Sequence, residues 1–119
     1  MAAKIRRALQ ARSQNTMDRI VEAAEQLLRE SASPELPVRE ICRLAGASPS
    51  SFYSRFPEKS ALLPLVVQRL AERGFAAIER ARELHTPDLP LDVVIPQALD
   101  LLAETWLAEA GLVRAILAA

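Results

Sequence analysis

A cluster of hydrogen-bonding side chains lies within twelve residues of this chain, in the stretch Ser-Pro-Ser-Ser-Phe-Tyr-Ser-Arg-Phe-Pro-Glu-Lys that begins at Ser48. Arginine can donate two parallel hydrogen bonds to guanine O6 and N7, whereas serine hydroxyls donate or accept and discriminate weakly between bases. Tyrosine and lysine end in groups that donate to phosphate oxygens. No nucleophile–base pair, metal-ligand cluster or phosphate loop accompanies them. We therefore expect recognition rather than catalysis, without a metal or cofactor.

Two short helices joined by a glycine turn are predicted to present these side chains. Four apolar residues before the cluster recur at helical spacing and form one face about two turns long: Val38, Ile41, Cys42 and Ala45. Gly46 supplies the left-handed residue that ends such a helix. Ser48 is a good N-cap, and Pro49 suits the first position of the next helix. We predict helices at 37–45 and 49–55.

The second of these helices has an apolar and a polar face. Phe52 and Phe56 lie four residues apart, so both are expected to face the first helix. The side chains left to point outward are the candidates for reading bases: Ser50, Ser51, Ser54 and Arg55. This arrangement is typical of a helix-turn-helix. A second interpretation of Arg55 pairs it with Glu58 instead.

The continuation of the segment resembles one protein family. The glycine turn and serine cap are followed by an aromatic pair ending in Tyr53, then by Phe56 and, three residues on, by Lys59 at the start of a long helix. With the helix before it, the pattern over Thr16–Leu70 resembles the tetracycline-repressor (TetR/AcrR) family of bacterial regulators.

This resemblance implies contacts with DNA phosphates. Family positions that contact phosphate fall on Tyr53 and Lys59, and we add the cap residue Ser48. The family's usual threonine at the start of the preceding helix is missing, because Leu-Pro occupies that position, and we expect Arg39 to replace it. The alternative for Tyr53 is a surface aromatic without a ligand.

The resemblance also implies an all-α fold and a mode of action. The implied fold is a three-helix DNA-binding domain with a helix-turn-helix, a long connecting fourth helix and a helical effector and dimerisation domain. A homodimer would grip a palindromic double-stranded DNA operator as a repressor, and a small-molecule effector would release it. We expect the chain to hold only an incomplete start of the regulatory domain, and to be a monomer or weak dimer by itself.

The remaining segments are predicted as helices and one linker. A first helix is expected at Thr16–Glu30, capped by Asn15 or Thr16, and a fourth from about Glu58 or Lys59 to Leu84. A fifth is expected at Leu91–Ala110, bent or restarted at Pro96, ended by Gly111 and followed by the beginning of a sixth. The domain ranges are an N-terminal arm at 1–15, a DNA-binding domain at 16–60, a connecting helix and linker at 61–86 and a regulatory part at 87–119.

Apolar residues of the late helices are candidates for the core. In the fourth helix they include Phe75 and Ile78. In the fifth they are Leu99, Leu102, Trp106 and Leu107. Because the resemblance places an effector site after the fourth helix, Leu99, Leu102 and Trp106 are also candidates for a ligand pocket.

Charge is distributed unevenly although the net charge is zero. Residues 1–60 contain ten basic and seven acidic residues, and the first fifteen contain no acid. The four basic residues of this N-terminal arm are Lys4, Arg6, Arg7 and Arg12. Such asymmetry suggests a polyanion as the partner of the basic part. The alternative is a charged tail that is merely solvated.

The single cysteine and the hydropathy of the chain indicate the cellular compartment in which we expect the protein. Cys42 is the single cysteine, which excludes an internal disulfide and a cysteine metal cluster and suits the bacterial cytoplasm. The chain has no run of 18 apolar residues and no signal-peptide core, so we expect no membrane partner. The rival function is a helical protein-interaction module that retains a helix-turn-helix scaffold without specific DNA binding.

Overall fold

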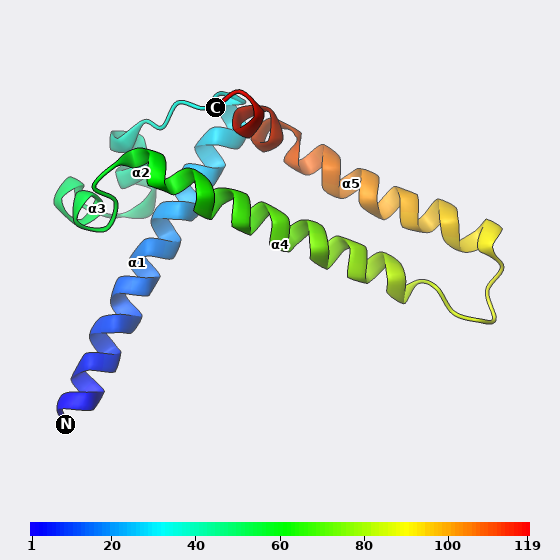
Figure 1. The fold of residues 1–119 in the computed structure, drawn as a ribbon, viewed down its shortest axis with the longest axis horizontal. Coiled ribbons are helices and arrows are strands. Elements are labelled where there is room, and N and C mark those ends of the chain that lie inside the picture. The colour runs from blue at the N-terminus through cyan, green and yellow to red at the C-terminus, as the bar shows by residue number, and fades with distance from the viewer.

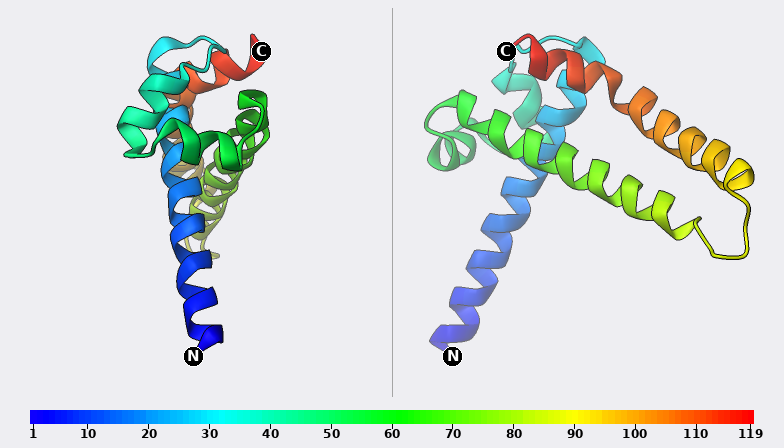
Figure 2. Two further views of the ribbon diagram at one scale, coloured as in Figure 1. Left: turned by 90° about the vertical axis from the view of Figure 1, so that its left-hand side faces the viewer. Right: turned by 45° about the vertical axis from the view of Figure 1, so that its right-hand side comes forward.

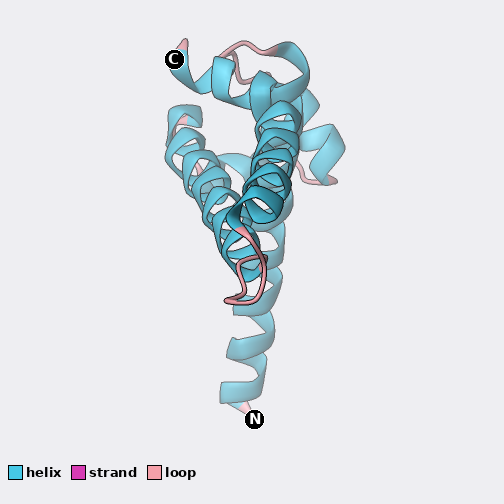
Figure 3. Ribbon diagram, turned by 90° about the vertical axis from the view of Figure 1, so that its right-hand side faces the viewer, coloured by secondary structure: helices cyan, strands magenta, loops and turns pink.

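The computed structural model describes every residue from Met1 to Ala119, and all of its regular elements are helices (Figure 1). The elements are α1 (Ala2–Ser31), α2 (Val38–Ala45), α3 (Pro49–Arg55), the 3-10 turn η1 (Lys59–Ala61), α4 (Leu62–Glu83) and α5 (Leu91–Leu117). Only loops connect these helices (Figure 3). The predicted all-α fold is confirmed.

The second half of α1 packs with α2, α3, the start of α4 and the end of α5 around one core. Its largest fully buried side chains come from all five helices: Ile20, Leu28, Ile41, Phe52, Leu62, Val66 and Leu112. Met17 and Leu27 lie at its margin. We call residues 17–56 the helix-turn-helix unit.

The turn of this unit has the predicted geometry. Gly46 ends α2 in the left-handed conformation, with φ 65°. The Ser48 hydroxyl then accepts a hydrogen bond from the Ser51 backbone N–H at 3.0 Å, which caps α3, and Pro49 occupies its first turn. Local sequence alone therefore sets the angle between α2 and α3.

α1 is longer than predicted. Neither Asn15 nor Thr16 caps it, because the helix continues unbroken from Ala2, and the Thr16 hydroxyl donates to the Arg12 carbonyl at 3.0 Å within it. The reason is composition: no Gly or Pro occurs before Pro34, and Ala, Arg, Leu and Gln are strong helix formers. Residues 1–12 are all exposed, and this basic segment projects from the body as a free helix (Figure 2).

α5 also differs from the prediction. It runs without a break through Pro96 and Gly111, so the end at Gly111 and the separate sixth helix were wrong. A Cβ atom on Gly111 would lie 2.1 Å from the backbone oxygen of Arg29. Gly111 is therefore a point of close approach between α5 and α1 rather than a helix terminator.

α4 and α5 form an antiparallel hairpin that extends from the helix-turn-helix unit and returns to the end of α1 (Figure 1). Side chains predicted as its core are largely exposed: Phe75 (68%), Ile78 (47%), Leu99 (60%), Trp106 (63%) and Leu107 (78%). In a layer of two helices each helix has a single covered face, which explains the error. No helix is long and apolar enough to cross a membrane.

Candidate nucleic-acid interface and adjoining cavity

The outer face of α3 carries three exposed side chains that were predicted to contact DNA. Ser50, Tyr53 and Ser54 are exposed, and the Tyr53 ring stands edge-on against Phe52 with centroids 5.2 Å apart. Phe52 is fully buried, so it holds the Tyr53 ring in place while the hydroxyl end remains accessible.

Arg55 was predicted to point outward, but its guanidinium group instead lies against Ser51 and Ser13. One terminal nitrogen donates to the Ser51 hydroxyl at 2.7 Å and to the Ser51 carbonyl at 3.1 Å, and the other donates to the Ser13 hydroxyl at 3.4 Å. The structure shows no pair with Glu58, which was the other interpretation. The bond to Ser13 thus links α3 to α1, and the bonds to the half-buried Ser51 orient the guanidinium group of Arg55 within α3.

The predicted phosphate ligands lie at helix starts. Ser48 caps α3, Arg39 is exposed in the first turn of α2, and Lys59 is exposed at the start of η1. Neither Arg39 nor Lys59 forms an ion pair, so both cations are free to meet an anion. The four basic residues of the arm, Lys4, Arg6, Arg7 and Arg12, project from several sides of α1 and are also unpaired.

An ion cluster that local sequence did not reveal joins α1, α4 and α5. Its members are Glu25 and Arg29 from α1, Arg69 and Arg73 from α4, and Glu109 from α5. Arg29 and Arg73 each donate to Glu109 at 2.9 Å. Glu25 accepts from Arg69 at 3.1 Å and from Arg73. Contacts up to 80 residues apart in sequence assemble it.

The cluster alters acid–base behaviour. Burial alone would raise the pKa of Glu109, but hydrogen bonds from Arg73 and Arg29 outweigh burial and lower this pKa below its ordinary value. Burial would lower the pKa of Arg73, but hydrogen bonds to Glu109 and Glu25 raise it. The carboxylate of Glu109 and the guanidinium group of Arg73 therefore both remain charged at neutral pH.

A pH titration tests this coupling. Because the folded-state pKa of Glu109 is lowered, its contribution to stability is complete above the ordinary carboxyl range near about pH 4 and is lost as the pH falls through the folded value. We expect Glu109→Gln to be less stable than the parent at neutral pH and to lose less further stability on acidification. Thermal unfolding between neutral and acidic pH measures this. Glu104→Gln, an exposed change on the same helix, should follow the parent, and a Glu109→Gln curve parallel to the parent would contradict the prediction.

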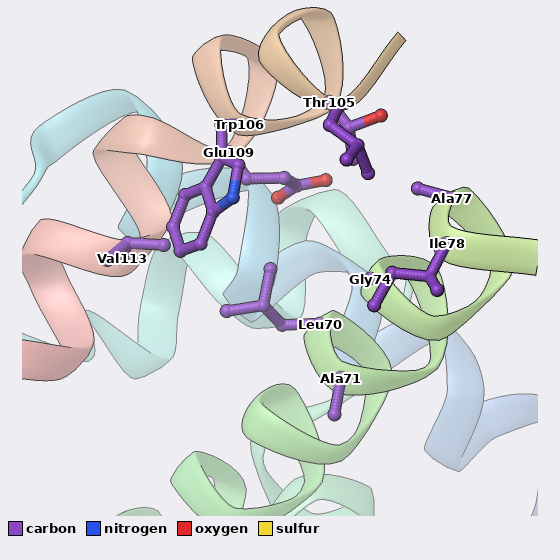
Figure 4. Close-up of a pocket in the computed structure, with 10 residues that line it drawn as sticks. Leu70, Ala71, Gly74, Ala77, Ile78, Thr105, Trp106, Glu109 and Val113 are labelled. Carbon is purple, nitrogen blue, oxygen red and sulfur yellow. The ribbon is translucent and has the colours of Figure 1, made fainter. Parts of the chain in front are cut away.

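A cavity of about 370 Å³ lies between α4 and α5 beside this cluster (Figure 4). Leu70 and Gly74 of α4 face Trp106 and Glu109 of α5 across it. Of the three predicted pocket residues, Leu102 and Trp106 line this cavity and Leu99 does not.

Residues 20–66 match the family described as bacterial regulatory proteins, tetR family. This part of the chain is therefore similar to the tetR family. The matched segment runs from α1 through the helix-turn-helix to the first residues of α4, and so contains α3 and Lys59. The resemblance predicted from the sequence is confirmed.

Curated relatives carry the same segment. The HTH-type transcriptional regulator UidR of Escherichia coli (strain K12) is 26% identical over 88 residues, and UidR of Shigella flexneri has the same identity. The alignment covers 73% of this chain but 45% of each relative. The chain therefore matches less than half the length of these regulators.

Proposed function

We propose that this chain is a tetR-family regulator, which binds double-stranded DNA through α3 and regulates transcription. The observation that carries this proposal is the outer face of α3, where Ser50, Tyr53 and Ser54 are exposed with the unpaired Lys59 close behind in sequence. Hydroxyl groups suit base edges and phosphates, and a lysine suits phosphates. The name of the UidR relatives, HTH-type transcriptional regulator, supports the same assignment.

We further propose a repressor whose homodimer holds a palindromic operator and releases it when a small molecule occupies the α4–α5 cavity. Glu109 supports the link between cavity and DNA, because it lines the cavity and also accepts hydrogen bonds from Arg29 of α1. A ligand that displaces Glu109 would alter the seam between α5 and the helix that carries the basic arm. Only such differential contacts allow a ligand to shift a conformational equilibrium.

The first test concerns Lys59 and Tyr53. We expect Lys59→Ala and Tyr53→Phe each to weaken binding to all duplexes alike, by about 1.5–3 kcal/mol, because phosphate contacts carry no sequence information. Lys59→Ala should also flatten the dependence of log affinity on log salt by about 1. Fluorescence anisotropy over a salt series measures both. Arg80→Ala, an exposed cation on α4, is the matched control, and an unchanged slope for Lys59→Ala would remove it from the interface.

A second test distinguishes two roles of Arg55, which are contact with a DNA base and the hydrogen bond that links α3 to α1. If Arg55 reads a base, it must leave Ser13, and Arg55→Ala should relax preference at one base position at a cost of about 1–3 kcal/mol. Ser13→Ala should leave the selected sequences unchanged. Selection from a random duplex pool compares the variants. Identical sites for Arg55→Ala and the parent would leave Arg55 with a structural role only.

The rival function is a protein-interaction module on the same scaffold. The exposed apolar side chains of the α4–α5 hairpin favour it, since such patches mark interaction surfaces. Salt dependence discriminates between the two, because DNA binding releases counterions and weakens steeply with salt. Absence of duplex binding at low salt would favour the interaction module.

A further inference from the structure

The polar groups that face the α4–α5 cavity are few. Seven of its ten lining residues are hydrophobic, and the side chains able to form ordinary hydrogen bonds with a ligand are those of Thr105 and Glu109, together with the Trp106 indole. Figure 4 shows the Glu109 carboxylate lying between Trp106 and Thr105, opposite Leu70. The indole N–H of Trp106 can only donate, so what a ligand must present to the other two side chains depends on whether Thr105 and Glu109 donate or accept.

Thr105 has no proton to offer. Its hydroxyl donates to the Leu101 carbonyl at 3.0 Å, one helical turn earlier, so its single proton is already used. What remains toward the cavity is oxygen lone pairs. A ligand atom that contacts this hydroxyl must therefore donate.

Glu109 imposes the same requirement. Its carboxylate is ionised, and both oxygens already accept hydrogen bonds, one from Arg73 Nε and the other from Arg29 and Arg73. An ionised carboxylate has about four acceptor positions and no donor. The positions left over can only accept.

The charge of the cluster excludes ionic ligands. Three guanidinium groups stand against two carboxylates, so the cluster carries one surplus positive charge. An ammonium group would add a like charge to it. A carboxylate ligand would meet the Glu109 oxygens first, because the guanidinium groups are engaged with Glu25 and Glu109 and do not line the cavity.

We propose that this cavity binds an uncharged, mostly apolar molecule that presents an O–H or N–H donor to Thr105 and Glu109. The assignment of such a molecule as effector rests on the proposed function, whereas its binding does not. Trp106 is the single tryptophan of the chain and lines the cavity, so its fluorescence reports occupancy directly.

Four probes of matched length test the proposal on the full chain: 1-octanol, methyl heptyl ether, octanoate and octylammonium. Titration of Trp106 fluorescence should give 1-octanol an affinity about 3–10 times that of the ether, which lacks a donor, since a neutral hydrogen bond has that value. Octanoate and octylammonium should bind more weakly than 1-octanol. A preference for octanoate or octylammonium, or no response to any probe, would overturn the proposal.

A variant tests whether Thr105 accepts the hydrogen bond that the ligand donates. Thr105→Val keeps the shape and removes the hydroxyl, so the advantage of 1-octanol over the ether should shrink, whereas the linker change Thr86→Val should preserve it. Equal ratios in Thr105→Val and the parent would overturn the assignment of Thr105. DNA affinity measured with and without 1-octanol is a separate result: unchanged affinity despite binding would contradict the effector function and leave the ligand class standing.

Discussion

Glu25→Ala is expected to lower the free energy of unfolding by about 3 kcal/mol, the low end of the cost of breaking a buried ion pair. Glu25 is 3% exposed and accepts hydrogen bonds from Arg29, Arg69 and Arg73. Without its carboxylate, Arg69 would lose its ion-pair partner, and Arg29 and Arg73 would keep Glu109 alone. Because these arginines are about one-third exposed, water compensates part of the loss.

Denaturant unfolding of the full chain measures this effect. Glu30→Ala removes a carboxylate from the same helix, but Glu30 is exposed and bonded only to Gln26, so we expect a change below about 0.5 kcal/mol. Equal losses in the two variants would show that the cluster contributes no more than a surface contact. Glu25→Leu separates the missing charge partner from lost volume, because leucine fills the site but leaves Arg69 without its ion-pair partner.

Gly111→Leu is expected to cost about 3 kcal/mol by forcing α5 away from α1, which lies at the upper end of overpacking costs. A Cβ atom at this position would lie 2.1 Å from the Arg29 carbonyl oxygen and 3.1 Å from its carbon. The obstacle is backbone, so no side-chain rotation relieves it. The shift would also strain the hydrogen bond from Arg29 to Glu109.

Gly74→Ala is the matched control within the other long helix. No atom lies within 4 Å of a Cβ placed there, so alanine should stabilise α4 by up to about 1 kcal/mol through helix propensity. Thermal unfolding of the two glycine variants gives opposite shifts if the close approach is real. A gain in stability for Gly111→Leu would mean that α5 does not dock on α1.

Sequence predicted the parts of the fold that local chemistry determines. Gly46, Ser48 and Pro49 set the turn between α2 and α3, and the observed bounds of α3 are those predicted. These residues act on neighbours within four positions. The four-residue spacing likewise predicted that Phe52 and Phe56 face inward, and both side chains are buried.

The incorrect predictions concern features that depend on contacts between residues far apart in sequence. Gly111 has a low helix propensity and so predicted an end, but its role depends on Arg29, which lies 82 positions earlier. The ion cluster was not predicted, because nothing near Glu25 or Glu109 in sequence indicates their arginine partners on other helices. Phe75 and Leu107 have helical spacing but lack a covering layer in the structure.

In the candidate site, too, sequence predicted the features that depend on neighbouring residues and missed those that depend on distant ones. The outward position of Ser50 and Ser54 follows from the phase of α3 relative to Phe52, and sequence predicted it, whereas Ser51 is half-buried. The orientation of Arg55 did not follow, because its partner Ser13 belongs to a segment that was predicted as an arm separate from the first helix. Continuity of α1 brings Ser13 to α3.

That continuity makes α1 a mechanical lever. Its 30 residues span about 45 Å, with the α5 seam at Arg29 near one end and the basic residues at the other. A rotation of about 5° at the seam displaces the far end by about 3 to 4 Å, for a rigid rod of this length. This is about the rise of one base step along a strand, about 3.4 Å. A small rearrangement around Glu109 that tilted α1 would therefore be enlarged at the basic end of the helix.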